Sequence, residues 1–166
     1  MGHTQAKKVA FGGVFAAVAL VIMLLGGLVP IATYVCPTLC TLICALVFKM
    51  CGKRIVSAWY CAVAILSLLF APDKEAAAVF VILGYYPIIK HYFQRVRFSF
   101  ILKLLYFNLS VILLYWILIN ILGITEIANE YAELGRIGLY LFLGLGNIVF
   151  FLLDRILQRF FQFKNK

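Results

Sequence analysis

The sequence predicts an all-α fold, a bundle of six transmembrane helices that forms one membrane domain over residues 1–166. Hydrophobic residues make up 66% of the 166 residues and charged residues only 13%, which is more apolar surface than a soluble domain of this size can bury. The apolar residues fall into long runs, and Lys and Arg cluster between these runs. This composition excludes a disordered chain, a disulfide-stapled secreted domain and an ordinary cytosolic enzyme.

The first two predicted spans differ in how well they fit a bilayer. The six predicted spans are 9–29, 31–48, 55–71, 72–89, 100–122 and 135–153. The first carries no charge and follows Lys7 and Lys8. Pro37 interrupts the second, and the stretch from Pro37 to Phe48 is about 18 Å long as a helix, too short for a hydrocarbon core of roughly 30 Å. We therefore expect residues 31–36 to form an irregular turn that dips into the membrane.

The later spans are placed by residues that commonly begin or end a helix. After the third span, the fourth opens with Pro72, Asp73 and Glu75, residues that suit the first turn of a helix. Pro87 is expected to kink or end this helix. In the fifth span, Lys103 lies close enough to the boundary for its ammonium to reach water. A loop over residues 123–134 then leads to the sixth span.

The distribution of charge predicts the orientation. With both termini in the cytoplasm, all but Lys74 and Arg136 of the 15 Lys and Arg residues lie inside, and five of the six acidic residues lie outside. Lys and Arg resist translocation, so this orientation is favoured. The net charge of +9 is thus evidence for topology rather than for a nucleic-acid partner. We expect a multi-pass protein of the cell membrane, in a bacterium the plasma membrane.

No motif predicts catalysis. The sequence lacks GxSxG, HExxH and P-loop patterns, and neither His3 nor His91 falls inside a predicted span. We therefore predict no enzyme activity, no catalytic residue, no cofactor and no metal site. Cys36, Cys40 and Cys44 share one helix face and offer a soft-metal site such as Cu(I), but small buried apolar side chains are the favoured interpretation.

Polar residues at the outer ends of the predicted spans form the candidate binding site. The candidate substrate-binding residues are Tyr34, Asp73, Glu75, Asn120, Glu126 and Asn147. The second and fourth spans both begin on the outer side, so their positive helix ends would point toward the same region. The alternative is that the outer residues are ordinary solvated loop residues. Asn147, near the middle of its span, must bond either to another helix or to a ligand.

The first span carries two pairs of small residues four positions apart. These pairs are Gly12 with Ala16 and Gly13 with Ala17. Side chains this small let another helix approach closely. The partner helix is either in another subunit, in which case all four residues dock on it, or in this chain.

These features together resemble the substrate-binding S components of energy-coupling factor (ECF) transporters. The run Gly12-Gly13-Val14-Phe15-Ala16-Ala17 looks like the alanine-rich docking surface of that family, with glycines in place of the earlier alanines. The resemblance implies six helices, an outward-facing ligand site, and partners that comprise a transmembrane coupling subunit and an ATPase pair. The Met-His start of the nickel and cobalt branch is absent, because His3 follows Gly2.

The resemblance implies a substrate-binding subunit of an ECF-type importer that takes up a small polar or anionic nutrient, a vitamin-like solute among them. The alternative is a non-transporting membrane scaffold that binds partners through residues 90–99 or through the basic tail. The scaffold would need no outward ligand pocket.

Overall fold

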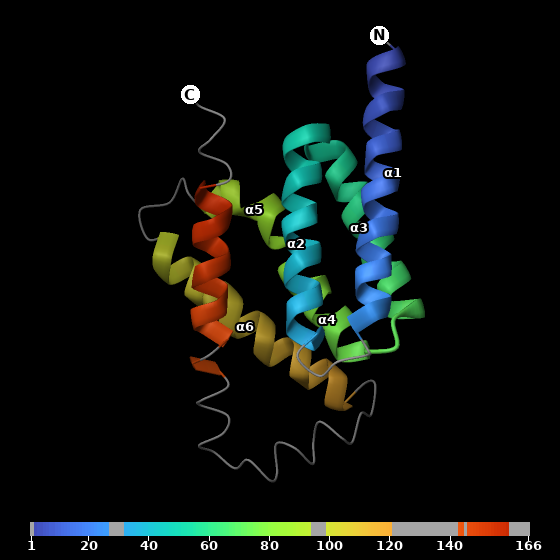
Figure 1. Ribbon diagram of the computed structural model, residues 1–166. Coiled ribbons are helices and arrows are strands. Elements are labelled where there is room, and N and C mark those ends of the chain that lie inside the picture. The colour runs from blue at the N-terminus through green and yellow to red at the C-terminus, as the bar shows by residue number, and fades with distance from the viewer. Residues whose placement is uncertain (1, 27–31, 94–98, 121–142, 145, 160–166) are drawn as a thin grey trace. The chain divides into compact units, whose positions relative to one another are not determined.

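A computed structural model of the chain describes residues 2–26, 32–93, 99–120, 143–144 and 146–159 (Figure 1). Its regular structure in these ranges is helical throughout. The helices are α1 (Gly2–Leu25), α2 (Ala32–Cys51), α3 (Lys53–Phe70), α4 (Lys74–Leu83), α5 (Tyr86–Phe93) and α6 (Ser99–Asn120). Residues 146–159 are also helical. Contacts divide the chain into two compact units, residues 1–92 and 93–166.

Three of the helices have the length and composition of membrane spans. They are the Gln5–Leu25 part of α1 and the whole of α2 and α3. The apolar part of α6, Ile101–Ile117, is shorter. The prediction of an all-α fold is therefore confirmed, and three of its helices are long and apolar enough to cross a membrane, whereas the six crossings and their orientation stay predictions.

The expected irregular turn over residues 31–36 is wrong where the structure describes it. Residues 32–36 belong to α2, which continues through Pro37 to Cys51. A proline inside a helix removes one backbone hydrogen bond, here the one to the carbonyl of Thr33, but it need not end the helix. As a result α2 has 20 residues, enough to span a bilayer.

The fourth predicted span is two short helices. It breaks at Gly84 and Tyr85, ahead of the proline that was expected to kink it. Pro87 instead lies in the first turn of α5, where its missing N–H has no helical partner to lose. Gly84 is needed for space, because a Cβ atom there would lie 2.7 Å from both the ring and the carbonyl oxygen of Phe80.

A single glycine connects α2 to α3. Gly52 has φ = 87°, a left-handed conformation that glycine adopts without a steric penalty. Its N–H donates to the carbonyl of Phe48 at 3.1 Å, and its own carbonyl accepts from Val56 at 3.1 Å. This connection lets α3 reverse at once and pack along α2, as Figure 1 shows.

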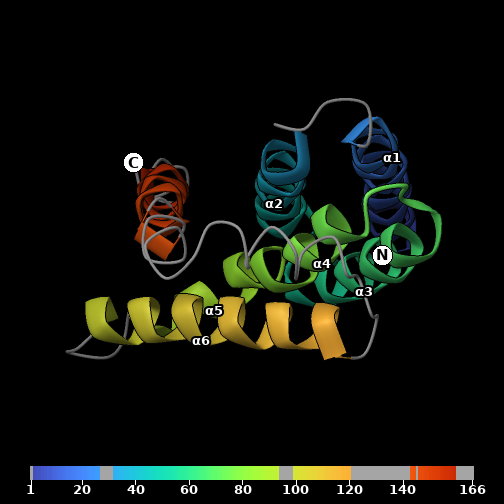
Figure 2. The same cartoon turned by 90° about the horizontal axis from the view of Figure 1, so that it is seen from below.

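Helices α1 to α4 meet around a core of small side chains and thiols. In Figures 1 and 2, α4 lies beside α2 and α3 at the end of the unit where α1 finishes. The buried small residues of the core are Ala19, Ala64, Ala71, Ala76, Ala77, Cys36, Cys40, Cys44 and Cys51. Phe80, Trp59, Met23 and several valines fill the remaining space. Small residues allow helix backbones to approach closely, which is the main source of packing energy between helices in a membrane.

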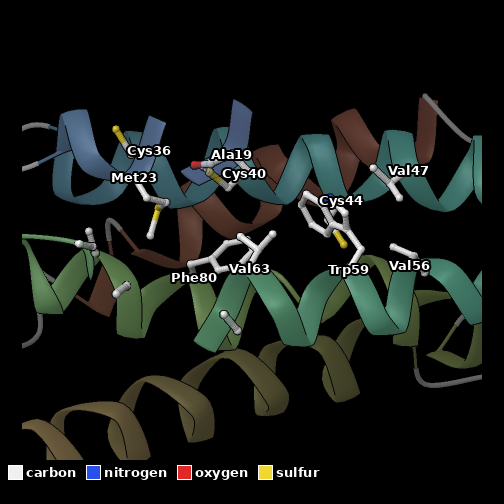
Figure 3. Packing of buried hydrophobic residues seen from close by; sticks show 14 of the residues in the cluster. Ala19, Met23, Cys36, Cys40, Cys44, Val47, Val56, Trp59, Val63 and Phe80 are labelled. Carbon is white, nitrogen blue, oxygen red and sulfur yellow. Dashed lines mark hydrogen bonds between the residues drawn. The ribbon is translucent and has the colours of Figure 1, made fainter. Parts of the chain in front are cut away.

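The thiols of α2 fix its position along α1. Cys40 Sγ donates to the carbonyl oxygen of Ala19 at 3.4 Å, and Cys51 Sγ donates to that of Lys8 at 3.3 Å. The two hydrogen bonds occur in opposite order along the helices, so α1 and α2 are antiparallel. Figure 3 shows Cys36, Cys40 and Cys44 along the face of α2 that is turned to the other core helices.

The outer surface of this unit is apolar. Large hydrophobic side chains are exposed along α1 and α3, among them Val14, Val21, Leu24, Leu69 and Phe70. A water-soluble protein rarely exposes such contiguous apolar faces. Small residues inside and large apolar residues outside are the pattern expected of helices surrounded by lipid.

We predict that Trp59→Phe leaves the free energy of unfolding within about 1 kcal/mol of wild type. The indole Nε1–H of Trp59 is buried beside Cys44 and has no hydrogen-bond partner among the described residues (Figure 3). Removing an unsatisfied donor recovers roughly 1–3 kcal/mol, which offsets the weaker apolar packing of the smaller ring. Trp59→Ala, which only opens a cavity, should cost about 3–5 kcal/mol. Thermal unfolding in detergent measures both, with Trp116→Phe at an exposed site as the control. A destabilisation by Trp59→Phe as large as that by Trp59→Ala would contradict this account.

Candidate functional site

Two side-chain hydrogen bonds join the start of α2 to the start of α4. Thr33 Oγ1 donates to Asp73 Oδ2 at 2.7 Å, and Tyr34 OH donates to Glu75 Oε1 at 2.9 Å. We call these four residues the α2–α4 clamp. The structure thus brings together three of the predicted substrate-binding residues, Tyr34, Asp73 and Glu75, and adds Thr33.

Helix-end chemistry holds both carboxylates of the clamp in place. Asp73 is the N-cap of α4, and its Oδ1 accepts the N–H of Ala76 at 3.0 Å while Oδ2 accepts from Thr33. Glu75 lies in the first turn of the same helix. Negative charge is favourable at both positions because the helix dipole places partial positive charge there.

Lys74, which lies between the two carboxylates in sequence, caps the end of α3. Lys74 Nζ donates to the carbonyl oxygens of Leu68 and Leu69 at 2.9 and 3.3 Å. These carbonyls lie in the last turn of α3, where no further helical N–H can reach them. Lys74 therefore caps α3, and the two carboxylates next to it are held toward α2.

The chemistry of the clamp is that of a hydrogen-bond acceptor. Both carboxylates are half-buried, and that of Asp73 carries more lone pairs than the donors of Thr33 and the α4 amide use. A ligand with ammonium, amidine or several hydroxyl groups would complement them, whereas an anion would be repelled. Among the described residues, no group of three or more His, Cys, Asp or Glu side chains is placed to hold a metal ion.

The other predicted binding residues belong to the second unit. Glu126 and the side chain of Asn120 lie outside the described residues. Asn147 pairs with Asn108 of α6: each amide donates to the other, at 3.2 and 3.1 Å, and each also donates to a carbonyl of its own segment. Of the two alternatives for Asn147, this geometry is that of a helix-packing contact.

The second unit contains an ion pair that sequence reasoning missed. Lys103 Nζ lies 2.9 Å from Asp154 Oδ2, and both side chains are only 7% exposed. Gln158 Nε2 donates to the same oxygen at 2.9 Å. Lys103 is therefore paired within the protein rather than extended toward water. The available signal was Lys103 inside the fifth predicted span and Asp154 one residue after the sixth, both near the same predicted membrane surface.

Aromatic packing continues this contact between α6 and residues 146–159. The rings of Phe107 and Phe150 stack with centroids 4.7 Å apart. A Cβ atom on Gly146 would lie 3.3 Å from the Phe107 ring, so the ring would have to move by a few tenths of an ångström to admit a side chain there. The pairs 103–154, 107–150 and 108–147 run in opposite order along the two segments, which fixes their register.

The two small-residue pairs of α1 face different surroundings. Gly12 is buried against Ile55 of α3, and Ala16 packs against the core. Gly13 and Ala17 are exposed, and a Cβ atom on Gly13 would meet nothing within 4 Å. The predicted docking set therefore divides into one pair used inside the unit and one pair that remains open.

Comparison of the chain with protein-family models, with curated proteins and with solved structures finds no match.

We predict that removing one partner of the Lys103–Asp154 pair destabilises the second unit, whereas removing both does not. Lys103→Met leaves a buried carboxylate without its cation, at a cost of about 3–5 kcal/mol. The double variant Lys103→Met/Asp154→Leu replaces the pair by apolar packing and should be close to wild type. Protease protection of residues 99–159 in detergent, followed by temperature, measures both. Equal destabilisation of the single and the double variant would contradict this prediction.

Proposed function

We propose that the protein is the solute-binding membrane subunit of an importer, similar to the S components of ECF transporters. The observation that carries the proposal is the α2–α4 clamp. It places two carboxylates side by side at the end of a helical unit whose three long helices have the length and composition of membrane spans.

The clamp narrows the solute class. Its polar groups are two carboxylates, one hydroxyl and one phenol, so the solute should carry hydrogen-bond donors, and a cationic group is favoured. The sequence-based expectation of a small polar, vitamin-like solute is thereby sharpened, and an anionic solute is disfavoured. In the predicted orientation the clamp faces outward, as uptake requires.

The exposed pair on α1 supports a second element of the proposal. Gly13 and Ala17 form a smooth strip, flanked by the exposed side chains of Val14, Val18 and Val21. A helix of a transmembrane coupling subunit could approach this strip closely. An ATPase pair bound to that subunit would supply the energy, and the chain itself would act without catalysis.

We predict that the gently purified wild-type protein retains a small molecule and that Asp73→Asn and Glu75→Gln weaken its binding by about 10- to 100-fold. The weakening corresponds to one charge-assisted hydrogen bond, about 1.5–3 kcal/mol. Asn is as good an N-cap as Asp, so Asp73→Asn should keep α4 folded. Native mass spectrometry measures the bound fraction. Thr38→Val, which alters a hydroxyl bonded only within α2, is the matched control. A wild-type protein without bound solute, or equal retention in all variants, would favour the scaffold alternative.

We further predict that Gly13→Leu abolishes co-purification with coupling and ATPase subunits from native membranes but leaves folding unchanged. Space around Gly13 is open, so the leucine meets no group of its own unit, and helix propensity rises by roughly 1 kcal/mol. Ala62→Leu places the same side chain on the exposed face of α3 and should leave the complex intact. Co-purification of Gly13→Leu at the wild-type level would contradict the docking assignment without affecting the solute-binding one.

A further inference from the structure

A small hollow lies between α1 and α3, at the ends of these helices that are close in sequence to the clamp. Its volume is about 100 Å³. The side chains around it include Leu20, Met23 and Leu24 of α1 and Leu66, Ser67 and Phe70 of α3. Met23 and Ser67 are fully buried and form its floor, whereas Leu24 and Phe70 are 46% and 66% exposed and form its rim. The hollow therefore opens on the outer surface of the two helices.

The interior of the hollow offers nothing to hold water. Ser67 is the polar side chain on its wall, and its hydroxyl donates to the carbonyl of Ala64 at 3.0 Å. A cavity retains water only when several polar groups face it, so this one is dry.

The hydrocarbon expected outside the rim points to a lipid acyl chain as the occupant of the hollow. Both helices have the length and composition of membrane spans, so hydrocarbon faces Leu24 and Phe70. An acyl chain entering the hollow breaks no hydrogen bonds and gains dispersion attraction that an empty space cannot supply. The hollow lies within the last two turns of each helix, so it would take the carbons close to the lipid headgroup.

A cation lies close to the rim of the hollow, at the end of α3. The exposed ammonium of Lys74 caps the last turn of α3, close in sequence to the rim residue Phe70. The two neighbouring carboxylates, Asp73 and Glu75, accept bonds from the first turn of α2 instead. A phosphate above the acyl chain would therefore find a donor in Lys74.

We propose that the hollow between α1 and α3 is a phospholipid site that holds the upper part of one acyl chain. This inference does not depend on the solute-binding function. It differs from the general contact of lipid with apolar surfaces because it requires occupancy of a shaped site.

The test is photo-crosslinking of the full chain in phosphatidylcholine vesicles. A trace of phosphatidylcholine with a diazirine near the carbonyl end of one acyl chain serves as the probe. We expect adducts on Leu20, Leu24, Leu66 and Phe70 at several times the yield on Leu69, an equally exposed residue of α3 outside the hollow. A probe with the diazirine at the terminal methyl should label the hollow less.

A matched pair of serine variants separates a site from general lipid contact. Ser67→Leu fills the floor and should reduce the hollow adducts several-fold without changing those on Leu69. Ser57→Leu is the control, because Ser57 also bonds only to a carbonyl of α3 but does not line the hollow. If Ser67→Leu does not fold, Leu24→Trp narrows the hollow from its exposed rim and should give the same reduction. Equal labelling of Leu69 and the hollow, or labelling that these variants leave unchanged, would overturn the proposal.

Discussion

Close approach of helix backbones is the constraint on which the first unit depends. Where lipid surrounds a protein, burying a leucine between two helices gains little, because lipid tails are as apolar as the leucine. Helices then adhere through many short-range contacts, which need small side chains at the interface. Alanines and thiols occupy these positions in α1 to α4, and Gly12 lets α1 meet α3. The large apolar residues are displaced to the outside.

Polar groups within this packing bond to one another across neighbouring helices. Cys40 and Cys51 donate to carbonyls of α1, and the clamp joins the ends of α2 and α4. In the second unit an ion pair and an amide pair hold α6 to residues 146–159. Each arrangement satisfies a group that hydrocarbon could not solvate. The clamp differs from the others because it gathers two carboxylates at neighbouring helix ends, and for this reason it is the candidate site.

The sequence predicted those features that depend on composition and on local signals. The apolar runs identified α1, α2 and α3, and the acidic residues around Asp73 identified the start of α4. Tyr34, in the expected turn over residues 31–36, was proposed as a neighbour of Asp73 and Glu75 because that turn and the start of the fourth span were both predicted on the outer side. Pro37 was misleading because a proline weakens a helix without revealing whether surrounding contacts sustain it. The break at Gly84 depends on the ring of Phe80 one turn earlier, and the Lys103–Asp154 pair depends on how two distant segments align. Such features depend on tertiary contacts, which the local sequence does not determine.

The two small-residue pairs of α1 lie on different faces of the helix, one packed inside the unit and one exposed. Residues one position apart on a helix point about 100° from each other, so adjacent small pairs lie on different faces. The pair of Gly12 and Ala16 is turned toward the core, which fixes the helix in the unit. The pair of Gly13 and Ala17 is then presented outward on a helix that cannot rotate without exposing the core. Because the inner pair holds the helix, the outer pair is preorganised, and a partner that binds it would cost α1 little conformational freedom.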